Sequence, residues 1–364
     1  MKILTWHVHG SYLYYLVMAG KASGHEHEFY LPVKPGKPEG APRPEGYGGR
    51  AGDFPWPDNM FDVPAEAVRD QKFDIILHQS RKNWEVDQHE ILSDAQRELP
   101  RIYLEHDPPR HASQDAPTNT KHIVDDPNVL LVHVTHFNNL MWDSNRTPTT
   151  VIDHGVSVPD HLRWTGELER GMVVVNGLMK RGRRLGYDIW QRVSEEVPLD
   201  LAGMESEEIG GMGPIPLTEL WQMEAKYRLF FNPIRYTSLG LAVCEAMMLG
   251  MPIIGLATTE MVTAVKNGVN GYVDTNISQL IDHMQRLLGD HGEAAELSRG
   301  AREYARERFG IERFARDWDQ TFRFVAGSPP VTQVSSLRRE ETSATEGAGA
   351  LSGLPSSSAA KMEA

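Results

Sequence analysis

The hydrophobic residues of this 364-residue chain fall into short runs, and segments with helical periodicity separate them. Short apolar runs bounded by polar or turn residues are typical of parallel strands that are covered on both faces. In the first half the expected strands are residues 3–6, 29–33, 73–77, 102–104, 129–134 and 150–152. Helical patterns over 11–20 and 85–98 alternate with them, which predicts a doubly wound α/β domain.

The same alternation starts again in the second half of the chain. The expected strands there are residues 172–175, 199–201, 228–231, 252–256 and 271–273. Residues 277–288 carry apolar side chains at i, i+3, i+4 and i+7, and residues 311–322 repeat that spacing, so both are expected to be amphipathic helices. The pattern predicts a second α/β domain.

The length of the chain agrees with two domains, because a single hydrophobic core seldom grows beyond about 250–300 residues. We expect a first domain over 1–155, a second over 156–310 and a last helix over 311–326. From 327 to 364 Ser, Pro, Gly and Ala replace the apolar period, which predicts a disordered tail. Residues 34–59 and 107–128 are expected to be surface loops, and the sequence leaves open whether they carry function.

Charge and cysteine content exclude several classes of protein. The 37 basic and 50 acidic residues give a net charge of −13, which argues against a nucleic acid partner. The single cysteine, Cys244, excludes an internal disulfide. The longest apolar stretch, residues 13–20, is shorter than the roughly 20 residues of a membrane span, and the N-terminus lacks the apolar region of a signal peptide. We therefore expect a cytoplasmic protein.

Candidate chemistry is concentrated where the strand at 228–231 leads into a helix. Ser238 is the expected N-cap and Gly250 the expected C-terminal stop, so a helix should begin near Gly240 with free backbone N–H groups. Such a helix start favours a phosphate. Glu245 lies one turn further, on the same face as Leu241, where its carboxylate is expected to accept hydrogen bonds from ribose hydroxyls.

Four segments resemble the retaining family-4 glycosyltransferases. Residues 240–252 are similar to that family's GL...EAM..G.P element, and Glu260 with residues 267–273 to its E...NG..G turn. Residues 24–29 and 151–156 resemble its GHEV strand entry and its VIPNGV hinge. The resemblance covers most of residues 1–325. It implies the GT-B fold, in which two Rossmann-like domains with parallel sheets face each other across a cleft and a closing helix, here 311–326, crosses back to the first domain.

The resemblance also assigns roles to individual residues. It implies that His106 faces the transferred sugar and that Arg181 and Lys180 act on the donor diphosphate. The other positions that it implies at the donor are Glu245, Gly240, Leu241, Ser238, Thr237, Leu239 and Arg183. A first loop that borders donor and acceptor would contain Gly10, Ser11 and Tyr12.

Two positions depart from the family pattern. The first acid of the family's E-x7-E motif, which contacts the sugar, falls on Thr237. The arginine of its GRL...KG motif falls on Gly177, and Lys180, Arg183 and Arg184 are the cations that would compensate.

The resemblance implies a metal-independent, hexosyltransferase-like reaction of carbohydrate biosynthesis. A nucleotide diphosphate sugar would be the co-substrate, with no cofactor, and an unidentified acceptor would bind the first domain. The histidines at 7, 9, 133 and 136 lack a carboxylate or cysteine at ligand spacing, so no metal site is expected.

Other functions remain beside this one. A dehydrogenase is excluded because GxGxxG is absent after the first strand. A noncatalytic nucleotide-sugar-binding protein and a nucleotide-sugar epimerase remain as alternatives, because fold does not fix function. Peripheral contact with a membrane is left open.

Overall fold

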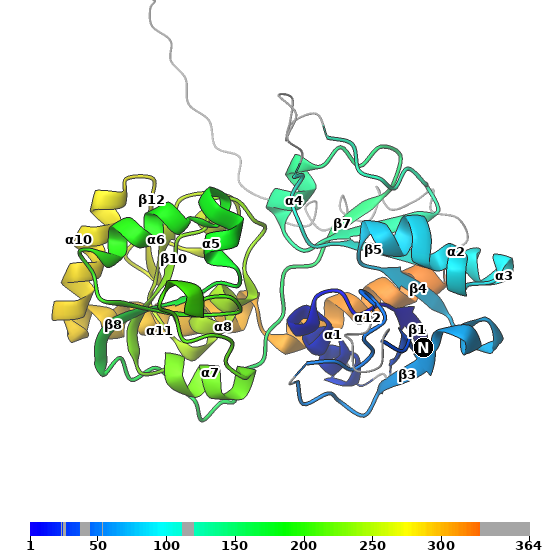
Figure 1. The fold of residues 1–364 in the computed structure, drawn as a ribbon, viewed down its shortest axis with the longest axis horizontal. Coiled ribbons are helices and arrows are strands. Elements are labelled where there is room, and N and C mark those ends of the chain that lie inside the picture. The colour runs from blue at the N-terminus through cyan, green and yellow to red at the C-terminus, as the bar shows by residue number, and fades with distance from the viewer. Residues whose placement is uncertain (23, 25–26, 37–43, 53, 111–119, 328–364) are drawn as a thin grey trace, which may run out of the picture.

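The computed structural model describes residues 1–22, 24, 27–36, 44–52, 54–110 and 120–327, which form two α/β domains (Figure 1). Residues 25–26, which belong to the GHEV-like segment, lie outside the described residues. The predicted tail beyond residue 327 also lies outside them.

The first domain is built on a seven-stranded sheet in which all neighbouring strands are parallel. Its order is β3-β2-β1-β4-β5-β6-β7. The strands are β1 (Lys2–Thr5), β2 (Glu28–Val33), β3 (Met60–Pro64), β4 (Ile75–His78), β5 (Arg101–Glu105), β6 (Val129–His133) and β7 (Thr149–Val151). The order reverses between β1 and β4, and ligands of doubly wound sheets bind at the carboxyl ends of strands at such a switch point.

The helices of the first domain differ from the sequence prediction in one place. They are α1 (Gly10–Ala22), η1 (Ala65–Asp70), η2 (Asn83–Asp87), α2 (Gln88–Ile91), α3 (Asp94–Arg97) and α4 (His136–Met141). The single helix expected over 85–98 is therefore wrong: a π-helical turn, η2, runs into α2, and α3 follows separately. Ser93 starts α3 with a capping box, in which its hydroxyl accepts from the Gln96 N–H and the Gln96 side chain accepts from the Ser93 N–H.

The second domain has a five-stranded sheet of order β12-β11-β10-β8-β9, again with parallel neighbours. The strands are β8 (Leu168–Val174), β9 (Leu199–Ala202), β10 (Tyr227–Asn232), β11 (Ile253–Leu256) and β12 (Gly271–Asp274). The helices are α5 (Leu178–Arg181), η3 (Gly182–Leu185), α6 (Tyr187–Ser194), η4 (Glu207–Ile209), α7 (Leu217–Glu224), α8 (Leu241–Leu249), α9 (Met261–Ala264), α10 (Ile277–Gly289) and α11 (His291–Arg308). The order reverses between β8 and β10, so the segments after these two strands flank the expected ligand position.

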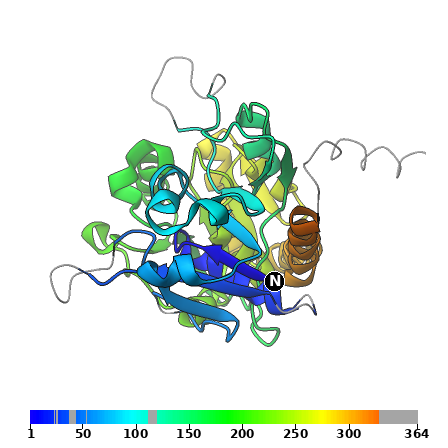
Figure 2. The ribbon, with the colours of Figure 1, turned by 90° about the vertical axis from the view of Figure 1, so that its right-hand side faces the viewer.

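The last helix, α12 (Ile311–Gly327), leaves the second domain and packs beside α1 in the first (Figures 1 and 2). Its apolar face buries Phe314, Trp318 and Phe322. The Phe314 ring lies edge-on to Tyr12, with 5.6 Å between the ring centroids. Burial of one such aromatic side chain contributes about 2–3 kcal/mol, so α12 is a structural part of the first domain.

Two parallel sheets in an α/β arrangement confirm the fold class expected from the sequence. The prediction missed β3, whose residues follow the Pro- and Gly-rich loop directly, and it did not identify α11, whose buried face is mostly alanine. Within the described residues, no helix is both long and apolar enough to span a bilayer.

Candidate donor-binding site

The carboxyl end of β10 lies against the first domain. Ser238, which follows β10, donates a hydrogen bond from its hydroxyl to the carbonyl of His106, at 2.8 Å. The buried ring of His154 donates through Nε2 to the carbonyl of Leu239, at 2.7 Å. These bonds place the loop before α8 beside the end of β5, so the candidate donor site lies where the two domains meet.

The N-terminus of α8 is open to a ligand. The N-cap is Gly240, and no side chain caps the helix. The expectation that Ser238 is the N-cap is therefore wrong, because the Ser238 hydroxyl donates its hydrogen bond to the carbonyl of His106. A Cβ atom added at Gly240 would meet no atom within 4 Å, which shows open space beside this residue. Thr237 and Leu241 are half-buried, whereas Leu239 is buried. The end of the helix retains unpaired donors for an anion.

Two cations of the turn after β8 already have carboxylate partners. The Nζ atom of Lys180 lies 2.8 Å from Glu205, and the guanidinium of Arg183 lies 2.7 Å from Asp188. All four side chains are exposed, so a ligand would have to compete with these ion pairs. The diphosphate roles expected for Lys180 and Arg183 remain predictions, and the geometry favours their neighbours.

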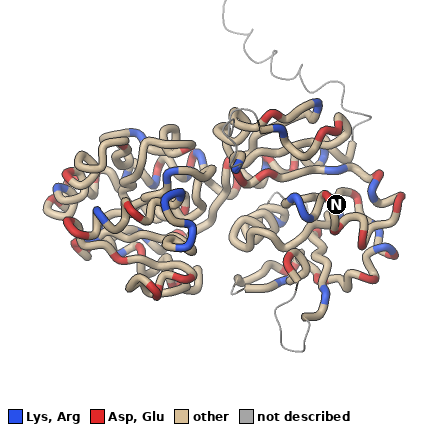
Figure 3. Tube along the Cα trace, turned by 45° about the horizontal axis from the view of Figure 1, so that its top comes forward, with Lys and Arg blue, Asp and Glu red and all other residues tan. Residues whose placement is uncertain are grey.

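Arg181 and Arg184 are the cations of this turn that have no ion pair within the described part of the chain. Arg184 is half-buried, and burial together with the positive charges of Arg110 and Arg181 lowers its pKa. Lys and Arg gather on the side of the second domain that faces the first (Figure 3). Arg184, which the sequence suggested only as a compensating cation, is therefore placed as well as Arg181 to meet an anion.

The backbone explains why an arginine is missing from the motif. Gly177 has a φ of 61°, in the left-handed region that side chains with a Cβ disfavour, and its N–H donates to the carbonyl of Met204. An arginine at this position would be strained. The chain instead has cations four and seven positions later, at Arg181 in α5 and Arg184 in η3.

His106 is held in one tautomer. The side-chain amide of Gln79 donates to Thr5 and to the carbonyl of Trp6, so its oxygen points to His106. His106 must then donate through Nε2, over 3.1 Å, which leaves Nδ1 as a hydrogen-bond acceptor. Burial, with His9 and His154 nearby, lowers the pKa of His106 well below 6.5, so the ring is neutral. A neutral acceptor suits a sugar hydroxyl.

The expected first loop is in fact the start of α1. Gly10 begins α1, Ser11 is half-buried, and Tyr12 is buried with its ring edge-on to His106 at 4.8 Å. Tyr12 is therefore a packing residue behind His106. A Cβ at Gly10 would lie 2.8 Å from the Phe54 ring, so glycine allows this close approach.

The carboxylate of Glu245 already has a hydrogen-bond donor from the first domain. Its side chain is 4% exposed, and its Oε1 accepts a hydrogen bond of 2.8 Å from the hydroxyl of Tyr15, on α1 of the first domain. Burial raises the pKa of Glu245 to about 7, and the bond from Tyr15 partly offsets that effect. The ribose role of Glu245 stays a prediction, and it requires that Tyr15 be displaced.

A second carboxylate, Glu224 on α7, is buried beside Glu245. It is 1% exposed, and neither of its oxygens has a hydrogen-bond partner among the described residues. Burial, and then the charge of Glu245, raises the pKa of Glu224 well above 4.5. Two buried carboxyl groups therefore lie near each other in the second domain, and neither forms an ion pair with a described residue.

We expect Glu224→Gln to stabilise the protein at pH 8 by about 1–2 kcal/mol and to change little at pH 5. Above pH 4.5 the unfolded chain releases the proton of Glu224 while the folded protein keeps it, so stability falls as the pH rises. Urea unfolding at both pH values measures the difference. Glu219→Gln, on the exposed side of α7, is the matched control, and a loss of stability at pH 8 in Glu224→Gln would contradict the assignment.

The E...NG..G-like turn is structural. Glu260 is buried and accepts from the backbone N–H of Phe137, at 2.8 Å, and from Arg308, at 2.6 Å. Asn267 pairs through both side-chain atoms with the backbone of Val273. Glu260 therefore ties the second domain to the start of α4 rather than meeting a ligand.

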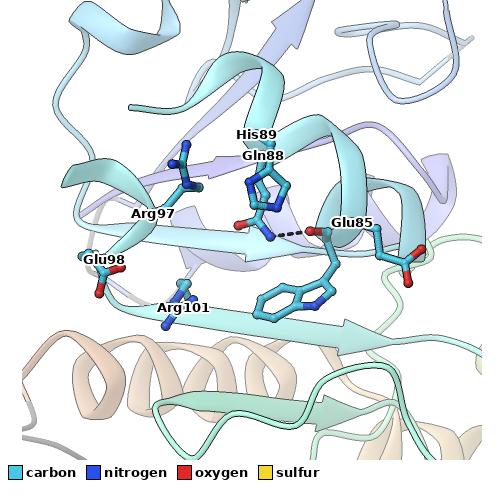
Figure 4. Close-up of a pocket in the computed structure, with 7 residues that line it drawn as sticks. Glu85, Gln88, His89, Arg97, Glu98 and Arg101 are labelled. Atoms are coloured by element: carbon cyan, nitrogen blue, oxygen red, sulfur yellow. Dashed lines mark hydrogen bonds between the residues drawn. The ribbon is translucent and has the colours of Figure 1, made fainter. Parts of the chain in front are cut away.

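One pocket lies apart from this site, between the helical segment that contains η2, α2 and α3 and the start of β5 (Figure 4). Its volume is about 490 Å³, and its lining residues are Trp84, Glu85, Gln88, His89, Arg97, Glu98 and Arg101. Arg97 and Arg101 already pair with Asp94 and Asp126. Among the described residues no group of three or more His, Cys, Asp or Glu is placed to hold a metal ion.

Part of the second domain is similar to a known family. Residues 192–290 match the family model described as Glycosyl transferases group 1. No curated protein matches the chain in sequence. The matched residues include β10, α8, β11 and β12, and with them the candidate helix N-terminus.

Solved structures share the fold over almost the whole chain. Sucrose-phosphate synthase from Thermosynechococcus elongatus is 17% identical, with 90% of this chain and 100% of that chain covered and a TM-score of 0.63. HepE from Anabaena, in complex with UDP and glucose, is 15% identical, with coverage of 88% and 98% and a TM-score of 0.62. A glycosyltransferase from Rickettsia africae is 12% identical, with coverage of 90% and 99% and a TM-score of 0.61. The fold is GT-B.

Proposed function

We propose that this protein is a glycosyltransferase that moves a sugar from a nucleoside diphosphate sugar to an acceptor with retention of anomeric configuration. The observation that carries the proposal is the arrangement at the switch point of the second sheet. There the uncapped N-terminus of α8 follows β10, and Arg181 and Arg184, which have no ion pair among the described residues, follow the neighbouring strand β8. Both features favour an anion of high charge density, such as a diphosphate.

The match to Glycosyl transferases group 1 includes α8, the helix whose N-terminus we propose as the diphosphate site. It therefore supports a nucleotide sugar as the donor. UDP with glucose in HepE makes uridine diphosphate the first nucleotide to test here. In the proposed reaction the acceptor hydroxyl attacks the anomeric carbon on the face that the diphosphate leaves. The bond to the phosphate oxygen breaks as the new glycosidic bond forms, and the leaving oxygen takes the acceptor's proton.

The protein's part in this reaction is electrostatic. Arg181, Arg184 and the start of α8 would stabilise the negative charge that develops on the leaving diphosphate. The neutral His106 would accept a hydroxyl hydrogen of the sugar through Nδ1. Closure of the two domains would exclude water and limit hydrolysis of the donor. No step in this scheme uses a metal ion, and the arginines supply the positive charge.

The proposal is tested by thermal unfolding and calorimetry with uridine, guanosine and adenosine diphosphates and their sugars. We expect one nucleotide to raise the melting temperature, since a ligand that binds only the folded state at 100 times its Kd stabilises by about 2.7 kcal/mol. NMR coupling constants of the product then report retention. Failure of every nucleotide to bind would overturn the proposal, and donor binding without release of diphosphate would favour a noncatalytic binding protein.

A further inference from the structure

Residues 106–110, which follow β5 in the first domain, lie against the segment of the second domain that contacts the basic turn. Tyr236 links them, because its N–H donates to the carbonyl of Arg184, at 3.3 Å, and its hydroxyl donates to the carbonyl of Pro109, at 3.0 Å. Arg110 follows Pro109 directly. Tyr236 therefore brings a first-domain arginine to the turn that contains Arg181 and Arg184.

The charges at this junction are unbalanced. Arg110 and Arg181 lie close enough to Arg184 for their positive charges to lower its pKa, and the carboxylate of Asp107 counteracts them only in part. Asp107 pairs with Arg110. Three cations around one anion repel each other, and an additional anion between them would relieve that repulsion.

The backbone just before Arg110 is anchored. The backbone N–H of Asp107 donates to the carboxylate of Glu105, at 2.9 Å, and its carbonyl accepts from the indole of Trp142, at 2.8 Å. The Arg110 side chain is 44% exposed, so its guanidinium can exchange Asp107 for a ligand without loss of a buried contact. A cation on a fixed backbone loses little entropy when it binds.

We propose that Arg110 is a phosphate-binding residue and that arginines of both domains hold the donor diphosphate. When no ligand is bound, the Asp107 carboxylate pairs with Arg110 in place of the phosphate. The inference rests on the proposed function. Arg110 supplies, from the first domain, the positive charge that Gly177 does not provide. The diphosphate then contacts both domains, whereas a nucleoside, which has no phosphate, cannot contact Arg110 in this way.

The test compares a nucleoside diphosphate with its nucleoside, uridine diphosphate and uridine first, by calorimetry on the full chain. Arg110→Ala is expected to raise the Kd of the diphosphate about tenfold and to leave the Kd of the nucleoside unchanged. Asp107→Asn, which removes the competing carboxylate, is expected to lower the Kd of the diphosphate. Arg146→Ala is the matched control, because Arg146 is an exposed first-domain arginine that pairs with Asp125, and its Kd values should equal those of the wild type.

Each result separates the inference from the proposed function. Diphosphate binding to the wild type that Arg110→Ala leaves unchanged overturns the inference alone. An equal loss of nucleoside and diphosphate binding in Arg110→Ala also overturns it, because a structural role would affect both ligands. Absence of diphosphate binding in the wild type overturns the proposed function and the inference with it.

Discussion

Arg181→Ala/Arg184→Ala is expected to weaken nucleoside diphosphate binding by about 100-fold or more and to lower turnover of the donor sugar in proportion. A hydrogen bond to a charged group contributes about 1.5–3 kcal/mol, and each 1.4 kcal/mol is tenfold in Kd. Neither arginine has an ion pair within the described residues, so their full charge is available to the phosphates. Calorimetry with the diphosphate and with the nucleoside measures the loss.

The comparison variant is Lys180→Ala/Arg183→Ala. These two cations lie on exposed ion pairs with Glu205 and Asp188, and exposed pairs contribute about 0–1 kcal/mol. We expect less than about a threefold change in Kd from removing them. Arg192→Ala, on an exposed side chain of α6, serves as the control for charge alone. A larger loss in the Lys180/Arg183 variant than in the Arg181/Arg184 variant would reverse the assignment of the diphosphate cations.

The second large effect concerns Glu245, whose carboxylate must bind the ribose of the donor if the sequence prediction holds. Glu245→Ala is then expected to weaken nucleoside binding about 10–100-fold, because hydrogen bonds to a charged acceptor are lost. Tyr15→Phe is expected to strengthen it, because the phenylalanine leaves the Glu245 carboxylate without its competitor. Calorimetry with uridine and the other nucleosides measures both changes.

The pH dependence gives an independent check. With a pKa of about 7 in the free protein, Glu245 is mostly protonated at pH 6 and mostly ionised at pH 8, so nucleoside affinity should rise over this range. Glu245→Gln should remove the dependence while keeping the shape of the side chain. An unchanged Kd in Glu245→Ala would end the ribose role and leave Glu245 as a contact of the domain interface with Tyr15.

Much of the fold could be predicted because buried parallel strands leave a strong signal. The run at 129–134 is apolar except for His133, the run at 252–256 has no polar side chain, and the strands that form there, β6 and β11, are buried along their whole length. The sequence did not predict the strand at 60–64, because only two of its five residues are buried and its last residue is a proline. The break in the helix at 85–98 was visible in Ser93 and Gln96, whose spacing is that of a capping box.

The candidate site could be predicted only in part, because sequence motifs identify segments and not the partners of side chains. Gly240 was identified correctly as the start of a helix. Nothing in the sequence showed that Lys180 faces Glu205 or that Tyr15 reaches Glu245 from a residue 230 positions away. Arg110 lies in an irregular loop without periodicity, so only the packing of two domains brings it to the basic turn.

The path of α12 has a consequence for the synthesis of this protein. The aromatic residues Phe314, Trp318 and Phe322 pack beside α1, which is made about 300 residues earlier. At translation rates of about 5–20 residues per second, the first domain waits on the order of 10–30 s after its own strands emerge before these side chains are available. During that interval its α1 face is exposed, so a nascent chain halted in the second domain is expected to be the form most prone to aggregation and most in need of a chaperone.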